Sequence, residues 1–455
     1  MKKVISDFKI KSPLTGNAIS DPIEFNLMFK CQIGPQGKVD AFLRPETAQG
    51  IFSIFKLFRS KKLPFLVGQT GSAFRNEIST GNGLIRTREF AMAEIEHFYD
   101  PEADPEVDLT DEILSTIVPI WTCSDQLTGN ALTAIPLRSL PVETSRDKIM
   151  IFHIYKMFKF CGEIGIDTSK LRFREQLNEE MAHYATQCYD LECRTSQGWI
   201  ECAGIADRGD YDLQNHSRAS NQLLHSSRRL EKPYKVETYE LSVDEGYWTR
   251  IGIKKRDIKA ARQAAMKYLA TEELKPEIME KDEILLPIRL KNQQGDWTGF
   301  PIRPKTDLKV KVKVIDTEPV MPHCIEPSYG ISRLVQTVLE HTYRTRLADG
   351  RKFFLFPVSI APISCSIITI RHARDGDEMS HIAKDIRLQL MRDHISFQSD
   401  LGGNLIGKKY KDNDEIGIPF TIAIDDQTIL SNTVTIRYRD TLNQIRIPID
   451  IISGK

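Results

Sequence analysis

The sequence contains no apolar run long enough to cross a membrane, and this absence sets the first limit on its function. A transmembrane helix needs about 20 consecutive apolar residues, and no segment of the 455 residues supplies them. Residues 1–11 are basic, but no apolar stretch follows, so we expect no secretory signal there. We therefore expect a cytoplasmic protein with no membrane partner.

The chain also lacks net charge and paired cysteines. Lys+Arg and Asp+Glu both number 62, so a nucleic-acid partner would be held by local basic patches and not by a global field. The eight cysteines form no CxxC pair, and the two nearest, Cys188 and Cys193, have no matching second pair. A structural zinc site is therefore not expected, and reduced thiols are typical of a cytosolic protein.

Residues 73–96 carry the most informative pattern. Two runs typical of strands, Ala73–Ile78 and Leu84–Glu96, flank the residues Thr-Gly-Asn-Gly, which predict a hairpin. The alternation of a strand then gives one face the following side chains: Arg86, Arg88, Phe90, Met92, Glu94 and Glu96. The opposite face carries Ala91, Ala93 and Ile95. Arginines at one end and carboxylates further along suit a ligand with a phosphate and an ammonium group. A solvated outer face of an antiparallel sheet is the alternative interpretation.

Longer motifs resemble a known family and favour the ligand-binding interpretation. Residues 74–77 (FRNE) with 88–90 (REF) resemble motif 2 of the class II aminoacyl-tRNA synthetases. Residues 43–52 (LRPETAQGIF) resemble the preceding segment of glycyl-tRNA synthetases, and residues 326–333 (EPSYGISR) resemble their motif 3. Further matches follow in order at 25–29, 180–185, 198–201 and 211–213. The resemblance to eukaryotic-type glycyl-tRNA synthetases therefore covers nearly the whole chain.

This resemblance implies an α+β fold, in which helices flank the antiparallel sheet of a class II synthetase. The catalytic domain would span 1–345, with inserted segments at about 100–150 and 218–310. A mixed α/β anticodon-binding domain would span 350–455, and the alternation of strand and helix patterns there favours that class independently. The patterns predict helices at 47–62, 151–161, 175–189, 257–270, 271–283, 331–339, 379–393 and 410–416. They predict strands at 199–206, 309–315, 355–370, 395–399, 420–425, 433–439 and 444–447.

The resemblance also implies a two-step reaction that needs ATP. The glycine carboxylate attacks the α-phosphate to give glycyl-adenylate, and the glycyl group then passes to the 3′ end of tRNA(Gly). By position in the motifs, Arg75 and Arg333 are the expected catalytic residues, because a guanidinium can pair with two phosphate oxygens at once. Arg333 would contact the ATP base and γ-phosphate, although its place on an amphipathic helix alone would make it a surface arginine. Glu77 would accept a hydrogen bond from the adenine amino group, and Phe90 would stack on the adenine ring.

Other residues of the expected ATP site come from the same motifs and from a later strand. Arg86 would reach the distal phosphates, while Asn76 and Thr87 would line the site. Glu201 and Cys202 match the family position for ATP and magnesium. Magnesium usually binds through ATP phosphates with one or two carboxylates, so Glu201 is the expected metal ligand.

The expected glycine pocket is acidic, because glycine offers no side chain and must be recognised through its ammonium group. Glu46, Glu94 and Glu326, with Pro327 and Ser328, match the family pocket for the amino acid. Taken singly, each glutamate could equally be a solvated or salt-bridged carboxylate.

Two basic features of the C-terminal region have competing interpretations. Gly402–Lys408 has the spacing of a phosphate-binding P-loop, but Lys409 stands where such a loop needs Ser or Thr. Contact with RNA is the preferred interpretation there, because Lys408, Lys409, Tyr410 and Lys411 combine charge with a stacking ring. Two roles are considered for three arginines of this region, contact with phosphates or solvated charge at the surface: Arg437, Arg439 and Arg446. Similarly, His97 and His323 lack metal-ligand spacing, so we expect structural histidines.

The resemblance is incomplete in two places. The family has motif 1, which forms its dimer interface, before the segment at 25–29, and the 24 preceding residues do not resemble it. The homodimer expected of the family is therefore in doubt. Ser332 stands where the family usually has glycine. The alternative function is a catalytically inactive, synthetase-like protein that binds RNA or a polymerase; the retained charged residues favour the enzyme.

Overall fold

The structure is a computed structural model. It describes residues 1–58, 61–243, 245–250, 255, 258–271, 280–286, 290–292, 295–297, 300–347, 349–370 and 376–452. The chain divides into two compact units, one formed by Met1–His225 with Met321–Lys455 and the other by Ser226–Val320. None of the described helices is long and apolar enough to cross a membrane.

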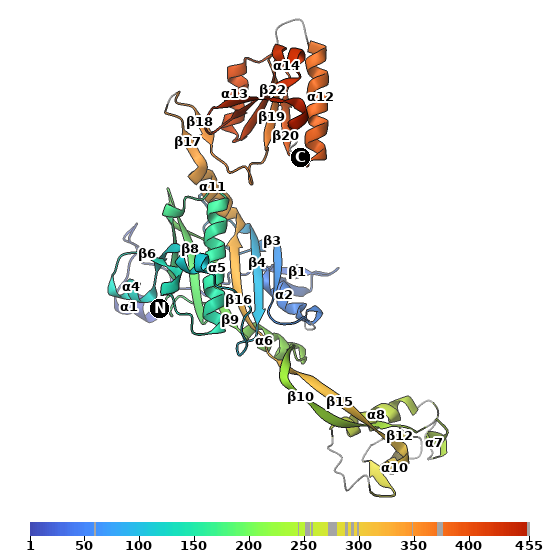
Figure 1. The fold of residues 1–455 in the computed structure, drawn as a ribbon. Coiled ribbons are helices and arrows are strands. Elements are labelled where there is room, and N and C mark those ends of the chain that lie inside the picture. The colour runs from blue at the N-terminus through green and yellow to red at the C-terminus, as the bar shows by residue number, and fades with distance from the viewer. Residues whose placement is uncertain are drawn as a thin grey trace. The chain divides into compact units, whose positions relative to one another are not determined.

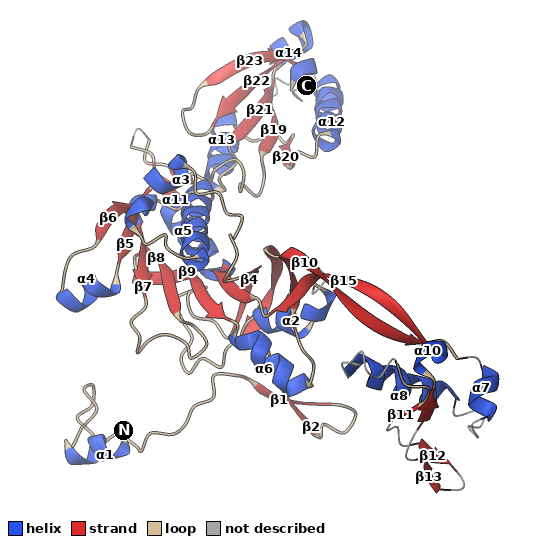
Figure 2. Cartoon of the chain, turned by 60° about the horizontal axis from the view of Figure 1, so that its bottom comes forward, coloured by secondary structure: helices blue, strands red, loops and turns tan. Residues whose placement is uncertain are grey.

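A large sheet organises the first unit (Figures 1 and 2). Its strand order is β3-β4-β16-β9-β8-β7-β5-β6. The strands are β3 Phe65–Phe74, β4 Glu89–Tyr99, β5 Ile117–Trp121, β6 Thr133–Pro136, β7 Leu171–Glu175, β8 Gln187–Thr195, β9 Gly198–Gly209 and β16 His323–Gly330. Neighbouring strands are antiparallel except β5 and β7. The mostly antiparallel sheet with flanking helices confirms the predicted fold class.

Shorter elements surround this sheet. The helices are α1 Lys2–Asp7, α2 Ala48–Ser53, α3 Asp111–Ser115, α4 Cys123–Thr128, α5 Ser145–Glu163, α6 Tyr211–Ser220 and α11 Ile331–Thr342. Single 3-10 turns are η1 Phe55–Leu57, η2 Leu137–Ser139 and η3 Thr168–Lys170. Two small antiparallel pairs join β1 Lys30–Ile33 with β2 Val39–Phe42, and β17 Tyr343–Thr345 with β18 Lys352–Phe354.

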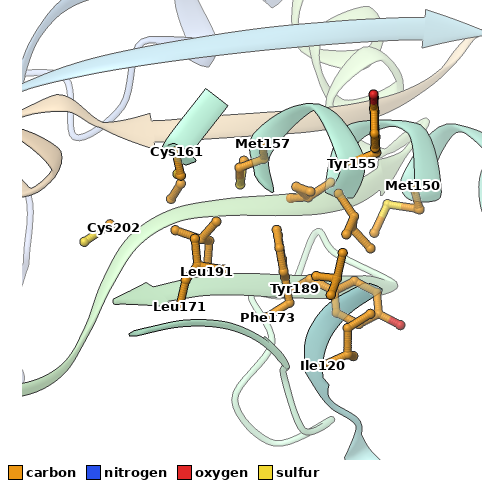
Figure 3. Close-up of a cluster of buried hydrophobic side chains, with 14 of the residues drawn as sticks. Ile120, Met150, Tyr155, Met157, Cys161, Leu171, Phe173, Tyr189, Leu191 and Cys202 are labelled. Atoms are coloured by element: carbon orange, nitrogen blue, oxygen red, sulfur yellow. The ribbon is translucent and has the colours of Figure 1, made fainter. Parts of the chain in front are cut away.

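One face of the large sheet forms the apolar core with helix α5. The helix begins with a capping box, in which Thr144 and Asp147 each accept a hydrogen bond from the other's backbone N–H. Its apolar side packs on the sheet: Figure 3 shows Met157 and Cys161 facing the buried side chains of the strands, among them Leu191. Burial of each such side chain contributes about 1.5–3 kcal/mol. The opposite face of the sheet carries polar residues beside a second buried cluster, in which Phe98 of β4 contacts Phe52 and Phe55.

The predicted hairpin is present, but its strands are displaced. Asn82 and Gly83 have φ of 58° and 65°, as a tight Asn-Gly turn requires. Strand β3 ends at Phe74 and β4 begins only at Glu89, so residues 75–88 form a loop and not two strand ends. The face assignment along β4 is confirmed for Phe90 and Met92, which line one hollow, and for Ala93 and Ile95, which line another beside α5. Ala91, which the alternation assigns to the second face, lines the first hollow as well.

The predicted helix at 175–189 is wrong. Glu175 and Tyr189 are Cα partners across the antiparallel strands β7 and β8, and a loop joins these strands. Tyr184, one of the residues whose spacing suggested a helix, packs on Arg208 instead: the centre of its ring lies 4.0 Å from the guanidinium carbon. The helix predicted at 47–62 is also shorter, since α2 ends at Ser53 and a 3-10 turn follows.

The second unit is built on a two-stranded antiparallel ribbon of β10 Ser226–Leu241 and β15 Leu308–Val320 (Figure 1). Its other elements are α7 Glu245–Arg250, α8 Ile258–Thr271, α10 Pro304–Asp307 and the strand pairs β11 Ile284–Leu286 with β14 Phe300–Ile302 and β12 Leu290–Asn292 with β13 Gly295–Trp297. The predicted strand at 309–315 and helix at 257–270 are confirmed. Most of the helix predicted at 271–283 lies outside the described residues.

The C-terminal part of the first unit has a mixed sheet of order β20-β19-β21-β22-β23. Its strands are β19 Cys365–Thr369, β20 Phe397–Asp400, β21 Phe420–Ile424, β22 Thr433–Tyr438 and β23 Gln444–Pro448, with α12 Gly376–Arg392, α13 Ile406–Glu415, α14 Asp426–Ser431 and the 3-10 turn η5 Ile449–Ile451. β19 is parallel to both its neighbours, and the remaining pairs are antiparallel. The predicted alternation of strands and helices is confirmed, although β19 is shorter than the run predicted at 355–370.

The expected RNA contact by Lys409 and Tyr410 is not supported. Lys409 is 2% exposed, and its Nζ donates to the main-chain oxygens of Thr369, Asp400 and Gly402 at 3.0, 3.0 and 2.7 Å. Tyr410 is buried as well. The lysine side chain therefore ties the strand ends together instead of reaching a ligand, which also explains the lysine after the P-loop-like spacing.

Two of the three candidate arginines for phosphate contact are structural. Arg437 pairs with both carboxylate oxygens of Asp414, at 2.8 and 2.9 Å, and Arg346 contacts the same carboxylate at 3.0 Å. Arg439 is buried and donates to two main-chain oxygens. Only Arg446 stays at the surface, where it forms an ion pair.

We expect Asp414→Asn to destabilise the C-terminal domain by about 3–5 kcal/mol, because it leaves the buried Arg437 without an anion, whereas the half-buried Arg346 keeps Asp349. Urea unfolding followed by circular dichroism measures this change. The matched control is Asp412→Asn on the same helix, whose carboxylate is exposed and lies 3.9 Å from Lys408; it should change stability by less than about 0.5 kcal/mol. Equal losses of stability in Asp414→Asn and Asp412→Asn would contradict the structural role given to Asp414.

Candidate active site

A pocket opens on the polar face of the large sheet, between the loop 75–88, strands β4, β9 and β16, and the start of α11. It encloses about 640 Å³ of space, part of which is open to solvent. The lining residues are Arg75, Glu77, Leu84, Ile85, Arg86, Thr87, Phe90, Ala91, Met92, Glu201, Cys202, Ala203, Ser328, Gly330, Ser332 and Arg333. The structure thus gathers most of the predicted ATP site around one cavity.

Arg75 is placed to meet an anion in this pocket. Its guanidinium carbon lies 5.6 Å from the centre of the Phe90 ring, and its Nε donates to the carbonyl oxygen of Pro45 over 3.4 Å. No ion pair to Arg75 or Arg86 occurs among the described residues. Two guanidinium groups that lack a protein carboxylate on the wall of a pocket make an anion site.

Arg333 connects three segments of the pocket wall. It lies in the first turn of α11, where its Nε donates to the Ile85 carbonyl oxygen at 3.0 Å and its Nη1 to the Glu201 carbonyl oxygen at 2.7 Å. The Glu201 carboxylate is 3.9 Å away. Arg333 is therefore directed into the pocket and not into bulk solvent. Nearby Ser332 fits without strain, since its Oγ accepts a hydrogen bond from the Ala91 N–H at 3.0 Å.

A β-bulge turns Cys202 away from the pocket. Glu201 is paired with Glu192, whereas Ala203 is paired with Leu191, so Cys202 is the extra residue on β9. Its Sγ lies 3.3 Å from the Thr337 hydroxyl on the core side. Cys202 therefore reaches the cavity only through its main chain, while Glu201 keeps its side chain on the polar face.

The expected glycine pocket is a cluster of acids around one buried arginine, Arg208, which is 1% exposed. Its Nε and Nη2 donate to the two carboxylate oxygens of Asp212 at 2.7 and 3.1 Å. Nη1 donates to Glu326, and Nη2 also contacts Glu46 at 3.4 Å. Burial, and after it the negative charge of Glu96, raises the pKa of Glu326 above its ordinary value, and the positive charge of Arg208 opposes this rise.

Glu94 joins this cluster to helix α2. Its Oε2 accepts hydrogen bonds from the N–H groups of Thr47 and Ala48, at 2.5 and 2.7 Å, and from the Thr47 hydroxyl. A carboxylate at these free N–H groups also benefits from the positive end of the helix dipole. Glu94 is Cα partner of Ser328, and Ser328 lines the cavity. The acidic cluster is therefore adjacent to the pocket that holds the arginines, although none of its carboxylates lines that pocket.

Two predicted residues lie outside this arrangement. Asn76 does not line the cavity, and its main-chain N–H donates to the Leu27 carbonyl oxygen at 2.6 Å. Pro327 alternates with Glu326 and Ser328 along β16, so it belongs to the opposite face.

Sequence reasoning missed Arg208, Asp212 and Tyr184. The spacing of four residues between Arg208 and Asp212 is no signal for the first two, because Arg208 lies at the end of a strand and the i,i+4 rule applies within a helix. Tyr184, whose ring packs on Arg208, was instead assigned to a helix. Nothing in the spacing indicates that contact, because the two residues lie on different segments.

The protein side chains of the pocket could bind magnesium only if nucleotide phosphates supplied further ligands. No group of three or more His, Cys, Asp or Glu side chains that could hold a metal ion occurs among the described residues. The Glu201 carboxylate, which is 57% exposed, lies on the cavity wall. One available carboxylate matches the usual magnesium site of ATP-binding enzymes, in which phosphates and water supply the other ligands.

The comparisons with known proteins agree with this geometry. Residues 29–211 match the profile "tRNA synthetase class II core domain (G, H, P, S and T)", and residues 358–455 match "Anticodon binding domain". A glycine–tRNA ligase of Methanocaldococcus jannaschii is 38% identical, over 99% of this chain and 78% of the relative. The chain belongs to the glycine–tRNA ligase family.

Other members of the glycine–tRNA ligase family are longer than this chain. The ligase of Caenorhabditis elegans is 38% identical over 100% of this chain and 62% of its own length, and that of Bombyx mori is 36% identical over 98% and 60%. The chain thus spans about three fifths of the length of these relatives. Prolyl-tRNA synthetase of Giardia lamblia, solved with prolyl-adenylate, superimposes with a TM-score of 0.50 at 15% identity, over 93% of this chain and 59% of that chain. This likeness concerns the fold alone.

We expect Arg208→Met to lower the free energy of unfolding by about 3–5 kcal/mol at neutral pH, because the neighbouring acids lose their shared cation. Thermal unfolding at several pH values measures this, and the loss should shrink as the pH falls and the acids become protonated. Arg218→Met, an exposed arginine on α6, is the control and should change stability by less than about 0.5 kcal/mol. Wild-type stability of Arg208→Met would show that the acids do not depend on Arg208.

Proposed function

We propose that this protein is a glycine–tRNA ligase. It activates glycine with ATP to give glycyl-adenylate and pyrophosphate, and then transfers the glycyl group to the 3′ end of tRNA(Gly). The observation that carries the proposal is a cavity with unpaired guanidinium groups on its wall, next to which, at Ser328, lies a cluster of carboxylates. Membership of the family supports the same reaction.

In the first step, a carboxylate oxygen of glycine attacks the α-phosphorus and pyrophosphate leaves. Negative charge develops on the phosphate oxygens, and Arg75 stabilises it with a charge that is fixed in place before the reaction. Arg86 and Arg333 hold the distal phosphates, and Glu201 would hold magnesium, which supplies further charge neutralisation when it is bound with ATP. Alignment of the two reactants lowers the barrier further, so no nucleophilic side chain is required.

The adenine end of ATP belongs beside Phe90 in this proposal. The ring offers a stacking surface, and Glu77 and Thr87 line the same part of the cavity. Cys202 contributes its main chain only.

The amino-acid end belongs to the acidic cluster. Glu46, Glu94 and Glu326 with Ser328 surround the ammonium group of glycine, and Arg208 keeps these acids in place. Pro327 shapes β16 between two of them without touching the substrate. An ammonium group among buried carboxylates forms charge-assisted hydrogen bonds, which contribute about 1.5–3 kcal/mol each.

The same proposal assigns residues 1–345 to catalysis and residues 350–455 to binding of the tRNA anticodon. Segments at about 100–150 and 218–310 are insertions in the catalytic domain. The homodimer and the cytoplasmic location expected from the sequence stay predictions.

Glycine-dependent exchange of pyrophosphate into ATP tests the proposal directly. We expect Arg75→Ala to lower kcat/KM for this exchange by about 10²–10³, the usual loss when one preorganised donor to a transition state is removed. Arg138→Ala, an exposed arginine outside the cavity lining, should keep wild-type exchange. A folded wild-type protein without exchange would favour a binding module that has lost catalysis, and normal exchange in Arg75→Ala would refute the assigned role.

The acidic cluster predicts a separate effect on glycine. We expect Glu326→Gln to raise KM for glycine at least about tenfold, as loss of a charged hydrogen bond implies, while KM for ATP changes less than about twofold. Steady-state exchange kinetics measure both constants. An equal rise of both KM values would place Glu326 outside the glycine pocket.

A further inference from the structure

Glu96 is a buried acid that the proposed reaction does not use. It lies on β4 two residues beyond Glu94 and is 0% exposed. Its Oε2 accepts a hydrogen bond from the Cys324 thiol at 2.8 Å. Its Oε1 has no hydrogen-bond partner, and no Lys, Arg or His forms an ion pair with it, among the described residues. A carboxylate in such surroundings is strongly disfavoured relative to the neutral acid.

Charged and titratable groups face Glu96 from several elements. Glu94 lies on its own strand, Cys324 and Glu326 lie on β16, Arg208 lies on β9 and Asp212 lies on α6. Burial raises the pKa of Glu96 to about 8, the positive charge of Arg208 and the Cys324 hydrogen bond oppose this rise, and Glu94 and Asp212 add to it. The pKa of Cys324 is raised far above its ordinary value by burial and by Glu96, so it stays a thiol donor.

The contacts of Arg208 decide where the shared proton sits. Arg208 donates directly to Glu326, whereas no hydrogen bond joins it to Glu96 among the described residues. Arg208 therefore favours negative charge on Glu326 over negative charge on Glu96, although burial and the charge of Glu96 raise the pKa of Glu326 as well. Two neighbouring acids that cannot both be ionised in this way titrate as a pair.

We propose that Glu96 is a positioning residue that holds a proton in the free protein and releases it to solvent when the ammonium group of glycine enters the acidic cluster. The inference rests on the proposed function, because it takes the glycine pocket as given. The only bond that breaks is the O–H bond of Glu96, and the carboxylate keeps the electron pair. The new positive charge stabilises that carboxylate.

Reciprocity fixes the direction of the pH effect. If glycine favours the ionised form of Glu96, then ionised Glu96 must favour glycine by the same factor. Affinity for glycine should therefore rise as the pH increases from about 7 to about 9, through the pKa of about 8. A coupling of ordinary size would make this rise about fivefold or more.

Calorimetric titration with glycine in two buffers of different ionisation enthalpy counts the protons released on binding. At pH 8 we expect about one third to one half of a proton per glycine for the wild type, because an acid is half ionised at its pKa and a coupling of fivefold or more ionises most of the rest. Glu96→Gln mimics the neutral acid and should release none, and its affinity should lack the rise with pH. Glu89→Gln, an exposed carboxylate on the same strand, should behave as the wild type.

Thermal unfolding tests the held proton without glycine. The pKa of Glu96 is about 8 in the folded protein and 4.5 as its ordinary value, so the folded state binds more protons between these limits. The wild type should therefore lose stability relative to Glu96→Gln as the pH rises from 4.5 to 8, and the difference should be constant above 8.

The outcomes separate the two proposals. Glycine binding with proton release that Glu96→Gln abolishes supports the inference. Glycine binding with equal proton release in wild type and Glu96→Gln overturns it and leaves the proposed function intact. An absence of glycine binding overturns the proposed function, and the unfolding curves then decide whether Glu96 holds a proton. If the stability difference between the wild type and Glu96→Gln does not change with pH, Glu96 holds no proton in the folded protein.

Discussion

The burial of Arg208 among carboxylates is the interaction on which the rest of the site depends. Burying a guanidinium that is 1% exposed is costly unless carboxylates surround it, and removing it would leave those carboxylates without their shared cation. This mutual dependence fixes Glu326 on β16, Asp212 on α6 and Glu46 before α2 at one place on the sheet. Three segments distant in sequence are thereby held at the position where an ammonium group would bind.

The sheet makes this arrangement possible because its two faces have separate roles. Helix α5 buries apolar side chains on one face, and the polar face carries the arginines and the acids. The bulge at Cys202 adapts β9 to both roles, because the extra residue sends its sulfur into the core and leaves Glu201 beside Arg333. A regular strand would place Glu201 and Ile205 on the same face, whereas the extra residue lets Glu201 line the cavity while Ile205 packs in the core.

Much of this could be predicted from the sequence. The alternation along β4 correctly separated Phe90 and Met92 from Ala93 and Ile95, because period-two patterns record which face a residue takes. Motif positions correctly brought Arg75, Arg86 and Arg333 to one cavity.

Other features depend on contacts between distant segments and escaped prediction. Tyr184 matches a helical pattern, but packing on Arg208 holds it in a loop. Similarly, Lys409 and Arg437 look like surface charges in the sequence, yet carbonyl oxygens and a carboxylate from other segments bury them. The sequence alone cannot distinguish a buried, fully paired cation from a solvated one, because the partners are not neighbours in the chain.

A crystal structure with a non-hydrolysable analogue of glycyl-adenylate would test the central claim most directly. We predict that the adenine lies against Phe90, the phosphate within about 3 Å of Arg75, and the glycyl ammonium within about 3 Å of the carboxylates that surround Arg208, at ordinary hydrogen-bond distances. An analogue bound elsewhere, or bound here with its ammonium group turned away from those carboxylates, would contradict the claim that one sheet face joins a nucleotide site to a glycine site.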